Sequence, residues 1–163
     1  MKENERPPID LKYDEELKNA YLRGFFREGL LVALSAELLQ RIRERKKLSI
    51  LSRLEQLNQD RLARIAGHLV SECEWKMAFE NGRTYARQFE GFSWPELMNE
   101  LLAWVKGANE AVRGLHVDSP EDHRPVLSQL SQHGIALEYF FSAEVDGRRR
   151  SLDAAIDLLS KTP

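Results

Sequence analysis

Three polar residues interrupt apolar helical patterns at positions where a helix would face a protein core. Each lies three or four residues from a large apolar residue on the same pattern, and the three are Glu28, Glu55 and His133. An unpaired carboxylate in a core is costly, so such residues need a charged partner, a metal ion, a raised pKa or a place at a bundle end. We take these three residues as the candidate site.

The elements that must position these residues are amphipathic helices. Apolar residues recur at intervals of three and four along four long segments. The first is expected to span 14–46, and Ser49 is expected to cap the second after a very short connection. Asn81-Gly82 is expected to break the long second segment, which leaves 83–89 as a separate piece.

Further capping signals place the remaining helices. Ser93 and Glu96 have the spacing of a capping box, and Ser119-Pro120 places proline at the first position of a fourth long helix. A short last helix is expected over 152–159. The glycines expected to end helices are Gly91, Gly114 and Gly147.

These elements predict an all-α fold, an antiparallel four-helix bundle with a short C-terminal helix. No alternating pattern is long enough to indicate a strand. Residues 1–13, which contain Pro7-Pro8 and many charges, are expected to form a flexible N-terminal arm. Residues 14–163 are expected to form a single helical-bundle domain.

Composition narrows the class of protein. Of the 163 residues, 42% are hydrophobic and 31% are charged, which is typical of a globular rather than a disordered chain. The formal net charge of −2 gives no strong overall attraction to nucleic acid or anionic membrane, and no apolar stretch approaches the roughly 20 residues of a membrane span. The single cysteine, Cys73, allows no internal disulfide. We expect a cytoplasmic protein with no nucleic-acid or membrane partner.

A basic run is expected in the last turns of the first helix, where cations complement the helix dipole. Its residues are Arg41, Arg43, Arg45, Lys46 and Lys47. We therefore interpret these basic residues as capping the helix and contacting solvent, and not as a nucleic-acid interface.

A pattern near the C-terminus resembles a known family. It consists of His133, Ala136-Leu137, Phe141, Glu144, Gly147 and Ser151-Leu152. Together with inward glutamates on the first two helices, it resembles the ferritin-like superfamily, in particular its bacterial members, over about residues 15–160. The resemblance implies a ferritin-like bundle that holds iron or another divalent metal, with Glu28, Glu55 and His133 as the ligands.

The metal motif is degenerate here. Metal-binding members combine carboxylates from two helices with a Glu-x-x-His pair from each of the other two. In this chain Asn58 stands where a histidine would follow Glu55, and Leu130 stands where a glutamate would precede His133. The three candidates could therefore form at most a partial site.

Three functions stay open. The favoured one is a non-catalytic bundle that binds a protein or small-molecule partner, because no complete catalytic set is present. The second is a ferritin-like metal-binding oxidoreductase, and the third is a metal-independent enzyme that uses acids in the bundle core. We also expect a homodimer, because the segment 29–39 is apolar nearly all round and one bundle buries only one face of a helix.

The expected turn argues against contact between Glu28 and Glu55. With a link at 47–49, Glu28 lies about 20 residues and Glu55 about 7 residues from the turn, an offset of roughly 20 Å at 1.5 Å per residue. Glu55 is then expected near a bundle end, within reach of water, with the two acids separate.

Overall fold

The computed structural model describes residues 8–37 and 41–161, and within them every regular element is a helix and none is a strand. This confirms the all-α prediction. The helices are α1 (Pro8–Glu37), α2 (Ile42–Ala66), α3 (Glu72–Tyr85), α4 (Trp94–Val117), α5 (Arg124–Val145) and the short C-terminal α6 (Asp153–Ser160). Three short 3-10 helices join them, namely η1 (Gly67–Leu69), η2 (Ala86–Phe89) and η3 (Glu121–His123).

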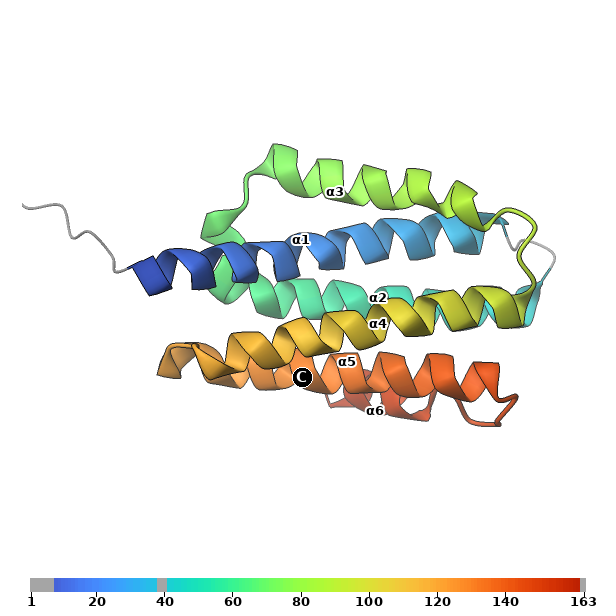
Figure 1. Ribbon diagram of the computed structural model, residues 1–163. Coiled ribbons are helices and arrows are strands. Elements are labelled where there is room, and N and C mark those ends of the chain that lie inside the picture. Colours follow the sequence, from blue (N-terminus) through green and yellow to red (C-terminus); the bar gives the residue numbers. More distant parts are fainter. Residues whose placement is uncertain (1–7, 38–40, 162–163) are drawn as a thin grey trace, which may run out of the picture.

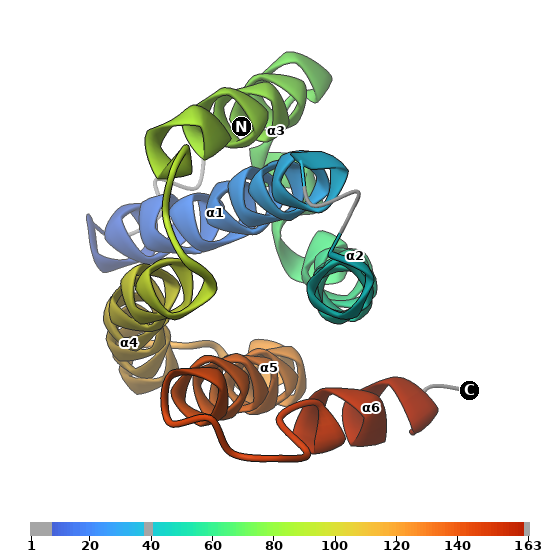
Figure 2. The ribbon, with the colours of Figure 1, turned by 90° about the vertical axis from the view of Figure 1, so that its right-hand side faces the viewer.

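The helices form a bundle of two packed hairpins. Helices α1 and α2 form one antiparallel pair and α4 and α5 form the other (Figure 1). The pairs face each other, with α1 beside α4 and α2 beside α5. Helix α3 lies outside against α1, and α6 packs on α2 and α5 at the far side (Figure 2). No helix of the described ranges is long and apolar enough to cross a membrane.

The core has two apolar clusters with a polar layer between them. One cluster includes Leu54 on α2 and Ala136 on α5. The other includes Leu62 on α2 and Leu130 on α5. The segments between these residues carry the buried polar side chains Glu55, Asn58, Gln59 and His133. The bundle therefore buries polar groups at mid-length, where an apolar core would otherwise be continuous.

The turn between the first two helices lies earlier than predicted. Helix α1 ends at Glu37 and α2 begins at Ile42, so the link expected at 47–49 is wrong. Neither glycine nor proline occurs between Gly29 and Gly67, and the N-cap residue Arg41 makes no side-chain capping bond. Leu48 is fully buried, so the apolar pattern of α2 already includes it. The turn therefore has no local signal that sequence reasoning could use.

The basic run consequently lies in the first turns of α2, and its predicted place at the end of a helix is wrong. Cations at a helix N-terminus are disfavoured by the dipole, so neighbouring acids must offset them. Arg41 pairs with Glu44, and Lys47 Nζ lies 2.6 Å from Glu144 Oε1.

The first helix also begins earlier than predicted, at Pro8 instead of residue 14. Proline is well tolerated in a first helical turn, where its missing N–H removes no helical hydrogen bond. Tyr13, expected in a flexible arm, is buried. The rest of the predicted arm, residues 1–7, lies outside the described residues.

The second segment breaks at 67–71, and the predicted break at Asn81-Gly82 is wrong. Ser71 and Glu74 form a capping box that opens α3. Gly82 lies inside α3, where a Cβ would be 1.9 Å from the backbone oxygen of Phe26. A Cβ on Gly29 would likewise be 2.0 Å from the backbone oxygen of Phe79. These glycines permit close contact between α1 and α3 instead of ending a helix.

The other turn signals have mixed outcomes. Gly91 and Gly147 adopt φ values of 81° and 66° at turns, and the Ser93 capping box opens α4, all as predicted. Gly114 does not end its helix, because α4 continues to Val117. Pro120 precedes η3 and does not open α5 directly.

Candidate functional site

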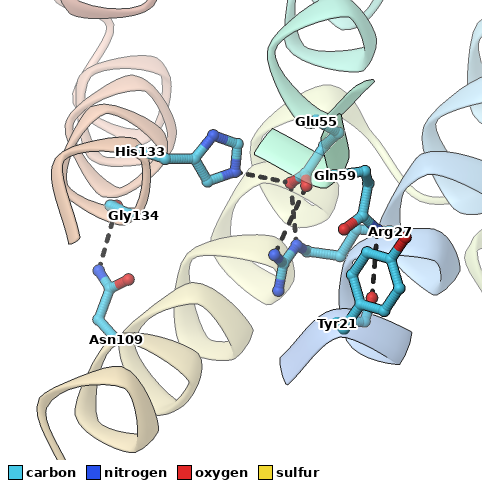
Figure 3. Close-up of polar contacts among 7 residues, drawn as sticks. All are labelled: Tyr21, Arg27, Glu55, Gln59, Asn109, His133 and Gly134. Carbon is cyan, nitrogen blue, oxygen red and sulfur yellow. Dashed lines mark hydrogen bonds and ion pairs between the residues drawn. The ribbon is translucent and has the colours of Figure 1, made fainter. Parts of the chain in front are cut away.

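Two of the three candidate residues meet in the middle of the bundle. His133 Nε2 on α5 lies 3.2 Å from Glu55 Oε1 on α2. Arg27 on α1 donates from Nε to the same oxygen at 2.9 Å (Figure 3). Glu55 is 0% exposed and His133 is 2% exposed. Three helices therefore converge on one buried carboxylate.

The third candidate, Glu28, lies nearby but faces another partner. It is nine residues before the end of α1, and Glu55 is thirteen residues after the start of α2, so the axial offset is about 6 Å. The predicted offset of roughly 20 Å, with Glu55 near water at a bundle end, is wrong because the turn lies earlier. Glu28 is half-buried and hydrogen bonds with Gln56.

The two glutamates differ in their ionisation. Burial alone would raise the pKa of Glu55, but the positive charge of Arg27 and the proximity of His133 outweigh it and hold the pKa at about 2. Burial raises the pKa of Glu28, and the negative charge of Glu55 adds to that rise. Glu55 is thus a stable anion that keeps Arg27 in place.

Several polar atoms around the ion pair are buried without a hydrogen-bond partner among the described residues. They are Nδ1 of His133, Oε1 of Gln59 and both polar side-chain atoms of Asn58. Gln59 Nε2 does donate to the Tyr21 carbonyl oxygen at 3.2 Å. A cavity of about 20 Å³ beside His133 has room for one water molecule.

The residues present do not fit a metal centre. Both oxygens of Glu55 face the guanidinium of Arg27, at 2.9 and 3.5 Å, so a cation already occupies that carboxylate. Within the described ranges no three histidine, cysteine, aspartate or glutamate side chains are grouped so that they could hold a metal ion. A site for iron or another divalent metal needs more ligands than this arrangement provides.

A cleft between α1 and α4 lies on the solvent side of this ion pair. Its volume is about 440 Å³. Arginines and an aromatic residue at helical spacing line it from α1, and small residues with one tryptophan line it from α4. The lining residues are Arg23, Phe26, Arg27, Trp104, Gly107, Ala108 and Ala111.

Arg23 is the uncompensated charge of the cleft. Its side chain is half-buried, and no carboxylate pairs with it among the side chains that the structure describes. Burial and the nearby charge of Arg27 lower the pKa of Arg23. A partly desolvated guanidinium without a counter-ion attracts an anion.

Arg27 connects the cleft to the interior. The cleft and the cavity beside His133 share Arg23, Arg27 and Ala108 as lining residues. Arg27 therefore contacts Glu55 on its inner side and lines the cleft on its outer side. On the cleft wall, the rings of Phe26 and Trp104 lie 6.3 Å apart between centroids.

Sequence reasoning missed both arginines. Their signal is the spacing Arg23-x-x-Phe26-Arg27, which places two cations on one face of the first helix among apolar positions. Trp104 lines the same cleft from α4.

Comparison with known proteins adds no identification. No protein-family model, curated protein or solved structure matches this chain.

Proposed function

We propose that this protein binds a small organic anion in the cleft between α1 and α4. The observation that carries the proposal is Arg23, a half-buried guanidinium that lines the cleft and has no carboxylate partner among the described side chains. A bound anion would supply the missing counter-charge. This is the small-molecule form of the binding function favoured by the sequence.

The cleft has the size and chemistry of a ligand site. Its volume of about 440 Å³ lies within the usual range of about 300–1,000 Å³ for small-molecule pockets. Such pockets combine apolar and aromatic walls with a few fixed polar groups. Here Phe26 and Trp104 supply the aromatic surface, and Arg23 supplies the polar anchor.

The buried ion pair supports the same role. Arg27 is held by two contacts to Glu55, so its outer surface has a defined position in the wall of the cleft. Preorganised groups of this kind lower the entropy cost of binding. Because Glu55 and His133 are almost completely buried behind Arg27, we propose binding and not catalysis.

We further infer that the bundle has ferritin-like connectivity. In that fold two antiparallel hairpins are joined by one long crossover connection. Here α3 lies in the connection between the α1–α2 and α4–α5 pairs, which supports this inference. The inference concerns the fold alone, because the residues do not fit the metal centre of that superfamily.

A pair of glycine variants tests the proposed function. A Cβ on Gly107, which lines the cleft, would meet no atom within 4 Å, so Gly107→Leu should fill the cleft without disturbing the bundle. Gly114, two turns along α4, has the same open surroundings but does not line the cleft, so Gly114→Leu is the matched control. Both variants should fold at least as stably as the parent, because leucine favours helix over glycine.

Thermal unfolding is measured with naphthoate, naphthalene sulfonate and naphthyl phosphate. An anion at a hundred times its Kd should stabilise the parent and Gly114→Leu by about 2.7 kcal/mol, or roughly 5–10 °C in Tm. Gly107→Leu should show no shift. The proposal is overturned if no anion raises the Tm of the parent, or if Gly107→Leu responds equally.

A further inference from the structure

We infer that the ligand of this cleft is a flat aromatic monocarboxylate, an inference that rests on the proposed function. One uncompensated guanidinium, Arg23, lies beside the aromatic side chains of Phe26 and Trp104, and opposite a wall of very small residues on α4. Charge, wall shape and wall chemistry each point to this class of ligand.

The charge of the site matches a single negative charge. Arg27 is neutralised by Glu55, which lies behind it with both oxygens toward the guanidinium. Arg23 then leaves one positive charge in the cleft. The second charge of a dianion would have no further cation to pair with, because Arg23 and Arg27 are the only charged residues that line the cleft within the described ranges. A monoanion leaves no such charge unpaired.

The guanidinium itself favours a carboxylate. Arginine presents two parallel N–H donors that match the two oxygens of a carboxylate in one plane. Arg23 makes no hydrogen bond or ion pair to another described side chain, so this fork is available to a ligand. Arg27 uses Nε and Nη2 on Glu55, which leaves Arg23 as the main anchor.

The α4 wall favours a flat ligand. Gly107, Ala108 and Ala111 lie at helical spacing and carry at most a methyl group. They leave a smooth wall on which a planar ring can lie. Trp104 stands one turn before Gly107 on the same wall.

The aromatic residues are held in place by further rings. Trp104 lies 5.1 Å from Tyr85 and 5.8 Å from Phe89 between ring centroids. Phe26 lies 5.7 Å from Tyr85. This cluster joins α1, α3, η2 and α4, so the two rings that line the cleft have fixed orientations. Fixed rings favour an aromatic ligand, which can stack on them or meet their edges.

The test uses isothermal titration calorimetry at pH 8 to compare three naphthalene ligands of different charge and one ligand without a ring. Naphthoate carries one negative charge, naphthalene carboxamide carries none, and naphthyl phosphate carries nearly two because its second pKa is about 6. Hexanoate serves as a monocarboxylate without a ring. We expect naphthoate to bind at least about ten times more tightly than each of the other three.

Substitution of Arg23 shows whether the anchor is this residue. Arg23→Met should weaken naphthoate at least about tenfold and leave carboxamide unchanged. Arg23→Lys keeps the charge but loses the planar fork, so naphthoate should weaken less. Lys106 is exposed, precedes Gly107 and does not line the cleft, so Lys106→Met is the control and should bind as the parent does.

The outcomes separate the two proposals. Tighter binding of naphthoate that depends on Arg23 supports the inference. Tighter binding of naphthyl phosphate overturns the choice of a monocarboxylate, and tighter binding of hexanoate overturns the choice of an aromatic ligand. Both results leave the anion-binding function standing. Equal binding of carboxamide and naphthoate, or no binding of any probe, overturns both.

Discussion

Glu55 shows how a buried charge can be retained in a small bundle. A fully buried carboxylate is tolerated only with compensating partners, and Arg27 and His133 provide them from two other helices. The same arginine lines the ligand cleft, so the ion pair links the core to the proposed site. The buried acid thus has a positioning role in the binding hypothesis, and it does not need a metal ion.

Removal of the Glu55 charge should destabilise the protein strongly. Glu55→Gln leaves Arg27, which is 20% exposed in the wall of the cleft, without its counter-ion. The loss should be about 3 kcal/mol, the low end of the cost of breaking a buried pair. Chemical denaturation at pH 7 measures this loss. Glu28→Gln is the control, because the raised pKa of Glu28 shows that its charge is disfavoured, so this variant should be as stable as the parent or slightly more stable.

The Glu55→Gln variant should also change how stability depends on pH. The folded-state pKa of Glu55 is lowered to about 2. The ionised side chain therefore contributes fully to the free energy of unfolding above its ordinary pKa of 4.5, and this contribution is lost as the pH falls from 4.5 through 2. The parent should lose stability over this range, and Glu55→Gln should lack that part of the loss. If the free energy of unfolding of both proteins falls equally between pH 4.5 and about 2, then the charge of Glu55 is not stabilised by Arg27 and His133.

At the scale of elements, two glycines determine how α3 packs. Gly29 on α1 and Gly82 on α3 each lie against the backbone of the other helix. Small residues at such crossings let two helices approach more closely than side chains would allow. The contact keeps α3 outside the α1–α2 and α4–α5 pairs, where its end supplies Tyr85 to the rings beside the cleft.

Gly82→Ala should therefore destabilise the protein although alanine favours helix. The new Cβ would lie 1.9 Å from the Phe26 oxygen, and overpacking of this kind costs about 1–3 kcal/mol or more. Gly114→Ala adds the same methyl group where no atom lies within 4 Å, so it should stabilise by about 0.5–1 kcal/mol. Urea titrations compare the two, and equal effects would contradict the close packing of α1 and α3.

At the scale of the whole molecule, the apolar surface of α1 is largely buried against other helices of the same chain. Leu30, Leu31 and Leu34 are buried, and α3 covers the face that carries Gly29. The apolar segment 29–39 is therefore a weaker reason for self-association than the sequence suggests. The homodimer stays a prediction, and other exposed apolar residues would have to form it.

The exposed face of α5 is where we expect that dimer to form. Ile135 is 65% exposed and Tyr139, one turn later, is 39% exposed. Light scattering should give about twice the chain mass of 18.9 kDa, and Ile135→Lys should return the protein to that mass. A parent that remains monomeric at high concentration contradicts the prediction.

The sequence by itself determined the local structure. The helical class, the Ser93 capping box, the turn glycines Gly91 and Gly147 and the short last helix all follow from neighbours within a few residues. It also identified Glu55 and His133 as polar residues at core positions. Capping and helical periodicity depend on interactions between residues at most four positions apart, so they can be read directly from the chain.

Only the tertiary structure decided how these pieces combine. The α1–α2 turn carries no glycine, proline or capping residue, so its position depends on how Leu48 and its neighbours pack in the core. That position brings Glu55 to the level of Arg27 and His133. From the sequence, Gly82 is predicted to break a helix, whereas in the structure it lies inside α3 and lets α1 pack closely against it. Arg23 and Arg27 become a site only when α4 closes the other side of the cleft, because no local interaction encodes contact between helices about eighty residues apart.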